Sequence, residues 1–352
     1  MTKKALCFGS AMIDIITILN SDNIEQLAFR NAHSKYLLVE QGQKLEAKTI
    51  TIHVGGGALN AACALSRLGF NSTPFVLVGD DVDRIRVKEH VNAFDLNNDH
   101  IIKIEGQPTG SAVMISSHDR NAAIFTRRGA NTGLRRKHLN RLDAITDHYF
   151  DLIHIAPLSG DSAKLLPELL AAATRLSDFI SCNPGIKQLQ TYGDSLLENA
   201  QSIKLLSLNL DEATAFAPQL SSFCDQLPIA SKRTDSKHIP MLKSEIGNIP
   251  LTWFMQQLHG LGIQNILVTD GSNGAFLYDG KLHHQPIIKT QVAGTAGAGD
   301  AFVSTLLGLL VKGYDSQNAL YGAATNASAV VAHADTSSGL MAFDALKQSC
   351  DL

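Results

Sequence analysis

Short apolar segments alternate with longer helical ones over much of the chain, beginning at Asp151. The apolar segments have the length of strands and are 151–156, 179–182, 204–208 and 265–269, with helical stretches such as 162–176 between them. Strands that alternate with helices usually pair in parallel, and the helices bury both faces of their sheet. This pattern predicts a doubly wound α/β domain in which a mostly parallel sheet is flanked by helices.

The part of the chain before residue 130 follows a different pattern. Residues 4–9 predict one more buried strand, but the later segments are rich in β-branched residues, and 48–54 alternates apolar with polar residues. That alternation is typical of strands with one exposed face. We therefore expect a small β-sheet lid within 15–54 and 107–130. Its strands are predicted at 35–39, 48–54, 112–116 and 122–126, with a turn at 118–121 between the last two.

Length and composition fit one large domain, 1–352, that carries this lid. The chain has 352 residues, of which 45% are hydrophobic and 18% are charged, so it can bury a large core. Its net charge of −3 and the absence of a long Lys or Arg run argue against a nucleic-acid partner. The scattered cysteines form no Cys-x-x-Cys pair and indicate neither a disulfide framework nor a zinc site; they are Cys7, Cys63, Cys182, Cys224 and Cys350.

No targeting or membrane segment is recognisable in the sequence. The apolar run after Lys4 is short and is interrupted by Asp14, unlike the core of a secretory signal peptide. The longest apolar stretch, 301–311, is too short to span a bilayer. We expect a cytoplasmic protein with buried free thiols and no membrane contact.

A glycine-rich turn directly precedes the apolar helix predicted at 301–311. Its glycines are Gly294, Gly297 and Gly299, and Asp300 follows them. A helix N-terminus presents unpaired N–H groups and a positive dipole end, and glycines let an anion approach the backbone closely. A carboxylate beside a phosphate is electrostatically costly, but it can accept the proton of a hydroxyl that attacks phosphorus. The turn thus predicts a phosphate site with Asp300 as the candidate base.

A plainer interpretation is that this turn only begins a helix whose dipole favours an acidic residue. Two other phosphate-binding motifs are excluded by their residues. No Lys-Ser or Lys-Thr pair follows the glycines, as a Walker A loop requires, and Phe302 stands where a dinucleotide fingerprint needs its third glycine. A phosphate cradle without lysine and a simple helix start both remain.

A second glycine run precedes a helix predicted at 58–68, which Gly69 would end. Gly55 and Gly56 would bring backbone N–H groups against a ligand, and Asn60 offers both a donor and an acceptor to a diol. Alternatively, the glycines only pack a tight turn between a strand and a helix.

Asp14 lies in an apolar run just after the first predicted strand. Open α/β sheets bind ligands at this carboxyl end of their strands. A carboxylate among apolar residues needs a partner that offsets its desolvation. Asp14 is therefore either a solvated acid at a strand end or a group that binds substrate hydroxyls.

Two more turns follow strands of the predicted sheet. Asn209 and Glu212 begin a helix, where they form a capping box or hold a hydrated magnesium ion together with a phosphate. Residues 269–274 form either a plain hairpin turn or a nucleotide contact.

The histidine pair at 283–284 lacks a third ligand at a suitable spacing and indicates a surface position rather than a metal site. The polar stretch 217–250 has no clear assignment and is interpreted as an insertion.

The two glycine runs resemble the two signatures of the ribokinase-like (PfkB) family of carbohydrate and nucleoside kinases. The first run matches Gly-Gly-x-x-x-Asn, and the second matches Asp-Thr-x-Gly-Ala-Gly-Asp except at its first position. The resemblance implies an anion hole and a catalytic base, which are Gly297, Ala298, Gly299 and Asp300. It also implies an acceptor site for sugar hydroxyls, which consists of Asp14, Gly55, Gly56 and Asn60.

The same resemblance implies a site for ATP and Mg²⁺. Asn209 and Glu212 match the family's Asn-x-x-Glu motif, and Glu212 would hold the magnesium ion through water. Gly294 stands where the family has an aspartate that helps to hold an activating monovalent cation, so we expect little dependence on potassium. The other positions implied to face the nucleotide are Thr269, Gly271, Gly274, Thr295 and Asn326.

Together these features predict a kinase that transfers the γ-phosphoryl group of ATP to a hydroxymethyl group of a sugar. A nucleoside kinase of the adenosine type is one alternative, favoured by the long segment between Asp14 and Gly55. A non-catalytic sensor of the same fold is another, although the retention of Asp300 and its glycines argues against it. The expected partners are ATP, a small sugar or nucleoside, and a second copy of the chain bound through the lid.

Overall fold

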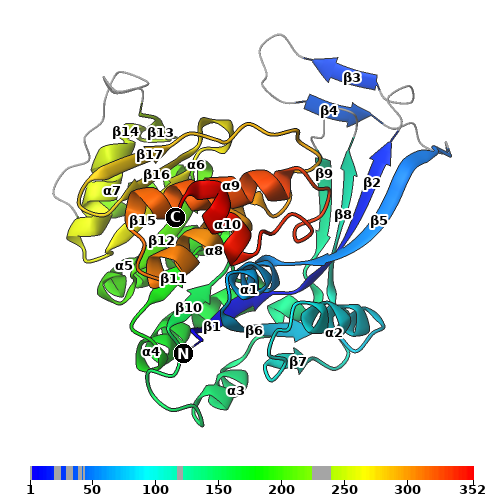
Figure 1. Cartoon of the computed structure of the whole chain (residues 1–352), viewed down its shortest axis with the longest axis horizontal. Helices are drawn as coiled ribbons and strands as arrows, with labels where there is room; N and C mark the ends of the chain where they lie inside the picture. The colour runs from blue at the N-terminus through cyan, green and yellow to red at the C-terminus, as the bar shows by residue number, and fades with distance from the viewer. Residues whose placement is uncertain are drawn as a thin grey trace.

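A computed structural model describes residues 2–19, 25–28, 35–38, 42, 44–116, 122–223 and 239–352. Its largest part is a nine-stranded sheet with the order β17-β16-β15-β12-β11-β10-β1-β6-β7 (Figure 1). The strands from β15 to β7 in this order pair in parallel, whereas β16 and β17 extend one edge in antiparallel pairs. The predicted doubly wound, mostly parallel sheet is confirmed.

All five strands predicted for the core belong to this sheet. They are β1 Lys4–Ser10, β10 Leu152–Ile155, β11 Ile180–Cys182, β12 Leu205–Asn209 and β15 Asn265–Thr269. The remaining strands are β6 Asn71–Val78, β7 Ile101–Lys103, β16 Ala275–Tyr278 and β17 Leu282–Gln285. Because the parallel strands run in one direction, their carboxyl ends meet at one edge of the sheet.

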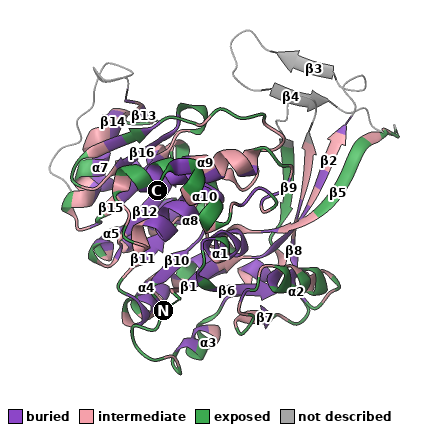
Figure 2. Cartoon of the chain, in the orientation of Figure 1, coloured by how far each residue is buried: buried purple, intermediate pink, exposed green. Residues whose placement is uncertain are grey.

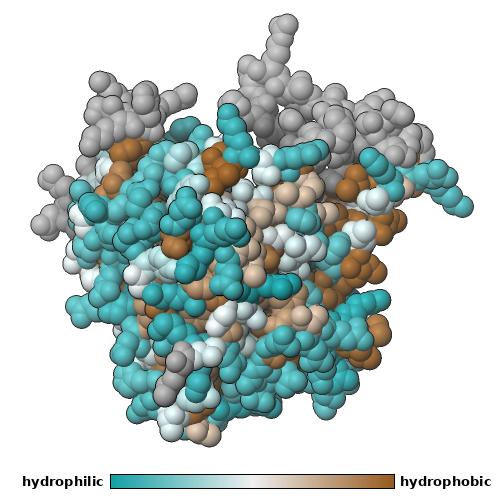
Figure 3. All heavy atoms as spheres, viewed as in Figure 1, coloured by the Kyte–Doolittle hydropathy of each residue, from teal (hydrophilic) through white to brown (hydrophobic). Residues whose placement is uncertain are grey.

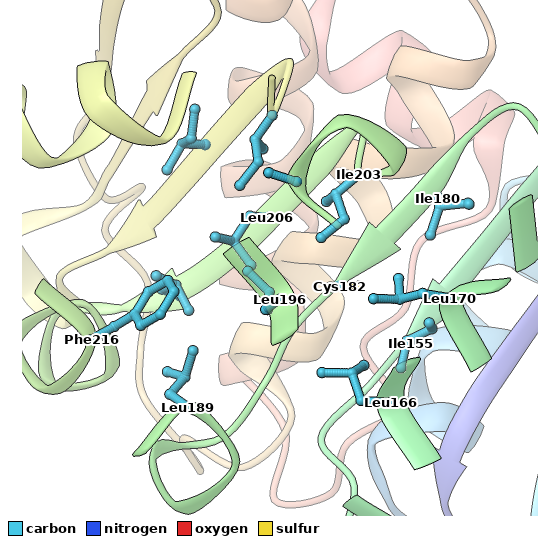
Figure 4. Close-up of a cluster of buried hydrophobic side chains, with 14 of the residues drawn as sticks. Ile155, Leu166, Leu170, Ile180, Cys182, Leu189, Leu196, Ile203, Leu206 and Phe216 are labelled. Atoms are coloured by element: carbon cyan, nitrogen blue, oxygen red, sulfur yellow. The ribbon is translucent and has the colours of Figure 1, made fainter. Parts of the chain in front are cut away.

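Helices cover both faces of the sheet because its central strands are apolar on both faces. In β1, Leu6 and Phe8 belong to one core, and Ala5 and Cys7 belong to the other. The first core, part of which Figure 4 shows, packs against α3 Arg136–Leu139, α4 Leu166–Leu176, α5 Ile186–Glu198, α6 Leu210–Phe216 and α7 Leu251–Gly260. The second packs against α1 Gly57–Arg67, α2 Asp83–Ala93, α8 Ala298–Val311, α9 Ser316–Val331 and α10 Phe343–Cys350.

A separate four-stranded sheet with the order β5-β2-β8-β9 projects from one side of this core (Figure 1). It is the predicted lid and consists of β2 Met12–Leu19, β5 Ala47–Gly55, β8 Gly110–Ser116 and β9 Ala122–Arg127. The two outer pairs are antiparallel, but β2 and β8 are parallel, so the lid is a mixed sheet. Figure 2 shows that residues of the lid are far more exposed than those of the main sheet.

The structure corrects the sequence analysis at two places in this region. Asp14, which was predicted just after the first strand and before the lid, lies inside the lid strand β2, since only Ala11 separates β1 from β2. The segment predicted at 35–39 is β4 Lys35–Leu38, which pairs with β3 Glu25–Ala28 in a two-stranded sheet of its own and not with the lid. The turn predicted at 118–121 lies outside the described residues.

One predicted helix begins in a different form, and the stretch that had no assignment contains regular structure. The helix predicted at 162–176 begins as the 3₁₀-helix η4 Gly160–Leu165, and α4 follows with Pro167 in its first turn, where proline is best tolerated. The stretch 217–250 contains the 3₁₀-helix η6 Ala217–Ser222 and a hairpin of β13 Met241–Ser244 and β14 Gly247–Pro250. Its residues 224–238 lie outside the described part. The remaining 3₁₀-helices are η2 Gly129–Thr132, η3 Asn140–Leu142, η5 Ala200–Ser202 and η7 Gly271–Asn273.

The cysteines that the structure describes are all free and buried, as predicted; they are Cys7, Cys63, Cys182 and Cys350. Cys224 lies outside the described residues. Among the helices of the described ranges, none has the length and apolar character needed to cross a membrane.

Candidate active site

The glycine-rich turn opens α8 at the carboxyl edge of the main sheet. Gly297 is the N-cap residue and has φ +77°, a left-handed conformation that favours glycine. A Cβ atom at Gly299 would meet no other atom within 4 Å, so this part of the turn faces open space. The N–H groups of Ala298, Gly299 and Asp300 precede the first backbone hydrogen bond of the helix, which the N–H of Ala301 donates to the carbonyl oxygen of Gly297 at 2.8 Å. This is the geometry of an anion-binding helix N-terminus.

Asp300 lies in this first turn and is half-buried. Its Oδ2 accepts a hydrogen bond of 2.7 Å from Nδ2 of Asn60, which lies on α1. Burial raises the pKa of Asp300 above its usual range, and the hydrogen bond from Asn60 acts in the opposite direction. One carboxylate oxygen is thus fixed by the protein, and the other is left for a ligand.

The first glycine run is packed tightly against its surroundings. Gly56 has φ +105°, and a Cβ atom there would lie 2.6 Å from the carbonyl oxygen of Ser10. A Cβ atom at Gly55 would lie 2.5 Å from Oδ2 of Asp14 and 3.5 Å from Oδ1 of Asn60. These glycines are therefore required by the close approach of β1, β2 and α1, as in the plainer interpretation. They also bring Asp14 and Asn60 side by side.

Asp14 is only 7% exposed, and no described residue donates a hydrogen bond to its carboxylate. Burial, followed by the negative charge of Asp300, raises its pKa from 3.8 to about 6. A buried carboxylate without a donor costs free energy unless a ligand hydroxyl supplies one. The environment of Asp14 thus indicates a binding group rather than a solvated acid.

Asn209 and Glu212 form the capping box that the plainer interpretation predicts. Oδ1 of Asn209 accepts from the N–H of Glu212, and Oε2 of Glu212 accepts from the N–H of Asn209, both at 2.8 Å. The pKa of Glu212 is raised by burial first and then by the charges of Asp211 and Asp300. The cap places Glu212 within electrostatic range of Asp300 and occupies only one of its two carboxylate oxygens.

The turn between β15 and β16 contains two glycines in different surroundings. Gly271 has φ +49° and meets no atom at its Cβ position, whereas Gly274, with φ +95°, lies against the carbonyl oxygen of Gln285. Thr269 ends β15, and Thr295 is exposed. These positions lie at the carboxyl end of the sheet, but no contact joins them to Asp14, Asn60 or Asp300 in the described structure.

Asn326 is completely buried and serves the fold. Its Nδ2 donates to Oγ1 of Thr305 on α8, and its Oδ1 accepts from the N–H of Met341 in the loop after α9. These contacts favour a structural role over a position beside adenine.

The histidine pair also forms contacts within the protein, since His283 contacts Asp279 and His284 contacts the carbonyl oxygen of Asn273. The described residues contain no group of His, Cys, Asp and Glu that could hold a metal by itself.

Sequence analysis missed one residue of this site, Thr336. It is 6% exposed and lies in the loop between α9 and α10, where its hydroxyl donates to Oδ1 of Asn60 at 2.9 Å. A single threonine in a loop carries no sequence signal, and Thr336 is 276 residues from its partner. The structure thus brings together Asp14, Asn60, Asp300 and Thr336, from four separate parts of the chain.

Comparison with known proteins identifies the family of the chain and its fold. The model of the pfkB family of carbohydrate kinases matches residues 2–342. The chain is 27% identical over 282 residues to fructosamine kinase FrlD of Bacillus subtilis (strain 168), with 79% of this chain and 84% of the relative covered.

Two solved structures show the same ribokinase-like fold. The nucleoside kinase of Methanocaldococcus jannaschii superposes with a TM-score of 0.72 at 21% identity, covering 99% of this chain and 98% of that one. The ribokinase of Arabidopsis thaliana, complexed with ribose and ATP, also gives 0.72, at 19% identity with full coverage of both chains. A family match over nearly the whole chain, together with this fold, shows that the protein belongs to the pfkB family of carbohydrate kinases and is a phosphotransferase acting on an alcohol group.

Proposed function

We propose that this protein transfers the γ-phosphoryl group of ATP to a hydroxymethyl group of a sugar. The observation that carries the proposal is the position of Asp300, a carboxylate in the first turn of α8 beside the exposed Gly299, whose Cβ position is open. A base and an anion site at one helix N-terminus suit a hydroxyl that attacks a phosphoryl group held by backbone donors.

In this mechanism the free oxygen of Asp300 accepts the proton of the acceptor hydroxyl. The hydroxyl oxygen forms the new bond to phosphorus while the bond to the leaving ADP oxygen breaks. Negative charge on the transferred group is stabilised by the N–H groups of Gly297, Ala298 and Gly299. Asp14 and Asn60 orient the acceptor, since Asn60 donates a hydrogen bond to Asp300 and Asp14 lies near enough for the charge of Asp300 to raise its pKa.

The residues present fit a magnesium ion that is held mainly by the nucleotide. Glu212 keeps one carboxylate oxygen outside its capping box and lies in the field of Asp300. Mg²⁺ usually binds through one or two carboxylates, water and substrate phosphates, so a full protein ligand set is not needed. When bound, the ion would neutralise phosphate charge, and Glu212 would orient its water.

The inner face of the lid favours an acceptor with an apolar part. Side chains alternate along β2, so Ile16 lies on the same face as Asp14, and the register places Met114 of β8 beside it. Fructosamine kinase and nucleoside kinase, two of the similar proteins, are named for acceptors larger than a free pentose. A nucleoside is therefore the second candidate acceptor.

The test is a coupled assay of ADP formation with pentoses, hexoses, their phosphates, fructosamines and nucleosides, with and without Mg²⁺. We expect magnesium-dependent turnover with at least one acceptor, and a kcat lower on the order of 10²- to 10⁴-fold with Asp300→Asn. Ligand binding to the wild type without turnover of any acceptor would instead support the non-catalytic sensor.

A homodimer through the lid is part of the proposal. The lid face opposite Asp14 carries a row of apolar side chains from adjacent strands, with Ile52 51% and Phe125 63% exposed. Figure 3 shows apolar atoms along this side of the molecule. Exposed apolar patches of this kind are typical of protein interfaces. Sedimentation of the wild type should give a dimer, and Ile52→Glu with Phe125→Glu a monomer; a wild-type monomer would contradict this.

A further inference from the structure

The loop between α9 and α10 touches both signature turns through one residue. The hydroxyl of Thr336 donates to Oδ1 of Asn60, and Nδ2 of the same amide donates to Oδ2 of Asp300. The three side chains form a chain of two hydrogen bonds, 2.9 Å and 2.7 Å long. An asparagine amide can turn over and exchange its oxygen and nitrogen. A hydroxyl that donates to the oxygen fixes the orientation in which the nitrogen faces Asp300.

The methyl side of Thr336 packs against the turn that begins α8. A Cβ atom at Gly297 would lie 2.6 Å from Cβ and 2.7 Å from Cγ2 of Thr336. Gly297 is the left-handed residue from which the N–H groups of the anion hole project. A β-branched side chain with a restricted χ1 angle therefore supports this turn on one side while its hydroxyl reaches Asn60 on the other.

Thr336 is itself held firmly by its neighbours. Oδ1 of Asp335 accepts from the N–H groups of Ser337 and Ser338 at 2.8 Å and 2.7 Å, which closes the loop just after Thr336. The far end of the loop is tied by the buried amide of Asn326, which accepts from the N–H of Met341. A residue that is buried and held on both sides can transmit a fixed geometry to the groups it contacts.

We propose that Thr336 is a positioning residue for phosphoryl transfer: its hydroxyl sets Asn60, and thereby Asp300, while its methyl group holds the Gly297 turn. This inference rests on the proposed function. It assigns to the loop 332–342 a role in positioning the catalytic base through Asn60. Asn326 contributes to this positioning indirectly, because it anchors the loop that carries Thr336.

Two substitutions separate the two contacts of Thr336. Thr336→Val keeps the shape and both branches but removes the hydroxyl, and Thr336→Ser keeps the hydroxyl but removes the methyl group. We expect Thr336→Val to lower kcat about 5- to 10-fold, the effect of losing one buried hydrogen bond, with little change in the KM for ATP. Thr336→Ser should keep most of the wild-type kcat. It should instead raise the KM for ATP about 2- to 5-fold, because the turn that forms the anion hole is held less firmly.

A double-mutant cycle tests whether Thr336 acts through Asn60. If it does, adding Thr336→Val to Asn60→Ala should lower kcat by less than about twofold beyond Asn60→Ala alone. The acidic limb of the kcat profile should also move to higher pH in Thr336→Val, because Asn60 then lowers the pKa of Asp300 less. Asp14 and Glu212, the other acids in the field of Asp300, are unchanged in both variants.

Several outcomes would overturn the inference while leaving the kinase assignment intact. They are a fully active Thr336→Val, a Thr336→Ser as impaired in kcat as Thr336→Val, or full additivity with Asn60→Ala. Thermal melting of each variant identifies loss of folding as a separate cause. By contrast, a wild-type protein that phosphorylates no acceptor would refute the proposed function itself.

Discussion

The turns that begin α1 and α8 are both rich in glycine, but Gly56 of the first turn and Gly299 of the second meet different surroundings. At α1, a Cβ atom on Gly56 would lie 2.6 Å from a backbone carbonyl oxygen of β1. At α8, a Cβ atom on Gly299 would meet nothing within 4 Å. The glycines of the first turn are thus required by the protein, and Gly299 is available for a ligand. A glycine motif therefore has to be interpreted through what surrounds each glycine.

The two turns also divide the chemistry between them. The α8 turn supplies Asp300, the proposed base, and the N–H groups at the helix start, whereas the α1 turn supplies Asn60 and, through Gly55, the close contact with Asp14. Substitutions in the first group should affect phosphoryl transfer or ATP binding, and those of Asp14 and Gly56 should affect acceptor binding or folding. Asn60 links the two groups, because it donates a hydrogen bond to Asp300. The following predictions test this division.

The largest expected effect is that of Asp300→Asn. The amide keeps the volume of the side chain but cannot take a proton, so kcat should fall on the order of 10²- to 10⁴-fold. ATP binding, measured by calorimetry, should change little. A variant with near wild-type turnover would remove Asp300 from the mechanism.

Asp14→Asn should raise the KM for the acceptor on the order of 10- to 100-fold, because the amide presents a donor where the acceptor hydroxyls need an acceptor. The KM for ATP should stay within about twofold. For the wild type, acceptor KM should rise as the pH falls below about 6, where Asp14 becomes protonated. Equal changes in both KM values would place Asp14 elsewhere in the site.

The same substitution should stabilise the protein. Folding raises the pKa of Asp14, so the folded protein is more stable when Asp14 is neutral. This contribution to stability is fully present below pH 3.8 and is lost as the pH rises through about 6. The rise from 3.8 to about 6 corresponds to ~3 kcal/mol. Asp14→Asn should therefore raise Tm at pH 7.5, and this gain should vanish near pH 4. A lower Tm of Asp14→Asn at pH 7.5 would show that the protein without ligand stabilises the Asp14 carboxylate.

Gly299→Ala and Gly56→Ala should have opposite effects on stability. Alanine at Gly299, in the first turn of α8, should stabilise by up to ~1 kcal/mol and raise the KM for ATP about tenfold, because the methyl group enters the phosphate site. Alanine at Gly56 should destabilise by ~2–4 kcal/mol through its positive φ and its overlap with Ser10. Denaturant unfolding and initial rates measure both. Similar losses of stability would contradict the comparison of the turns.

The smallest expected effect is that of potassium. A Cβ atom at Gly294 would lie 3.0 Å from the carbonyl oxygens of both His333 and Ala334, but Gly294 itself brings no carboxylate to offset cation desolvation. Initial rates in potassium and in a bulky organic cation of equal concentration should differ by less than about twofold at fixed ionic strength. A several-fold activation specific to potassium would show that backbone carbonyls alone make the site.

The sequence by itself determined the class of the fold and most of the chemical groups. Alternating apolar strands and helices required a doubly wound sheet, because such strands must be covered on both faces. The two glycine runs identified both helix N-termini and their polar residues, because positive φ angles and open helix ends depend mainly on local residues. The capping box of Asn209 and Glu212 was also predictable, since its two hydrogen bonds span three residues.

Only the tertiary structure decided how these groups meet. The bond between Asn60 and Asp300 joins residues 240 apart, and that between Thr336 and Asn60 joins residues 276 apart. Such contacts depend on how β2, α1, α8 and the loop after α9 pack together, and no local pattern encodes that packing. For the same reason Asn326, which the sequence suggests as a nucleotide contact, is found as a buried anchor of the loop that holds Thr336.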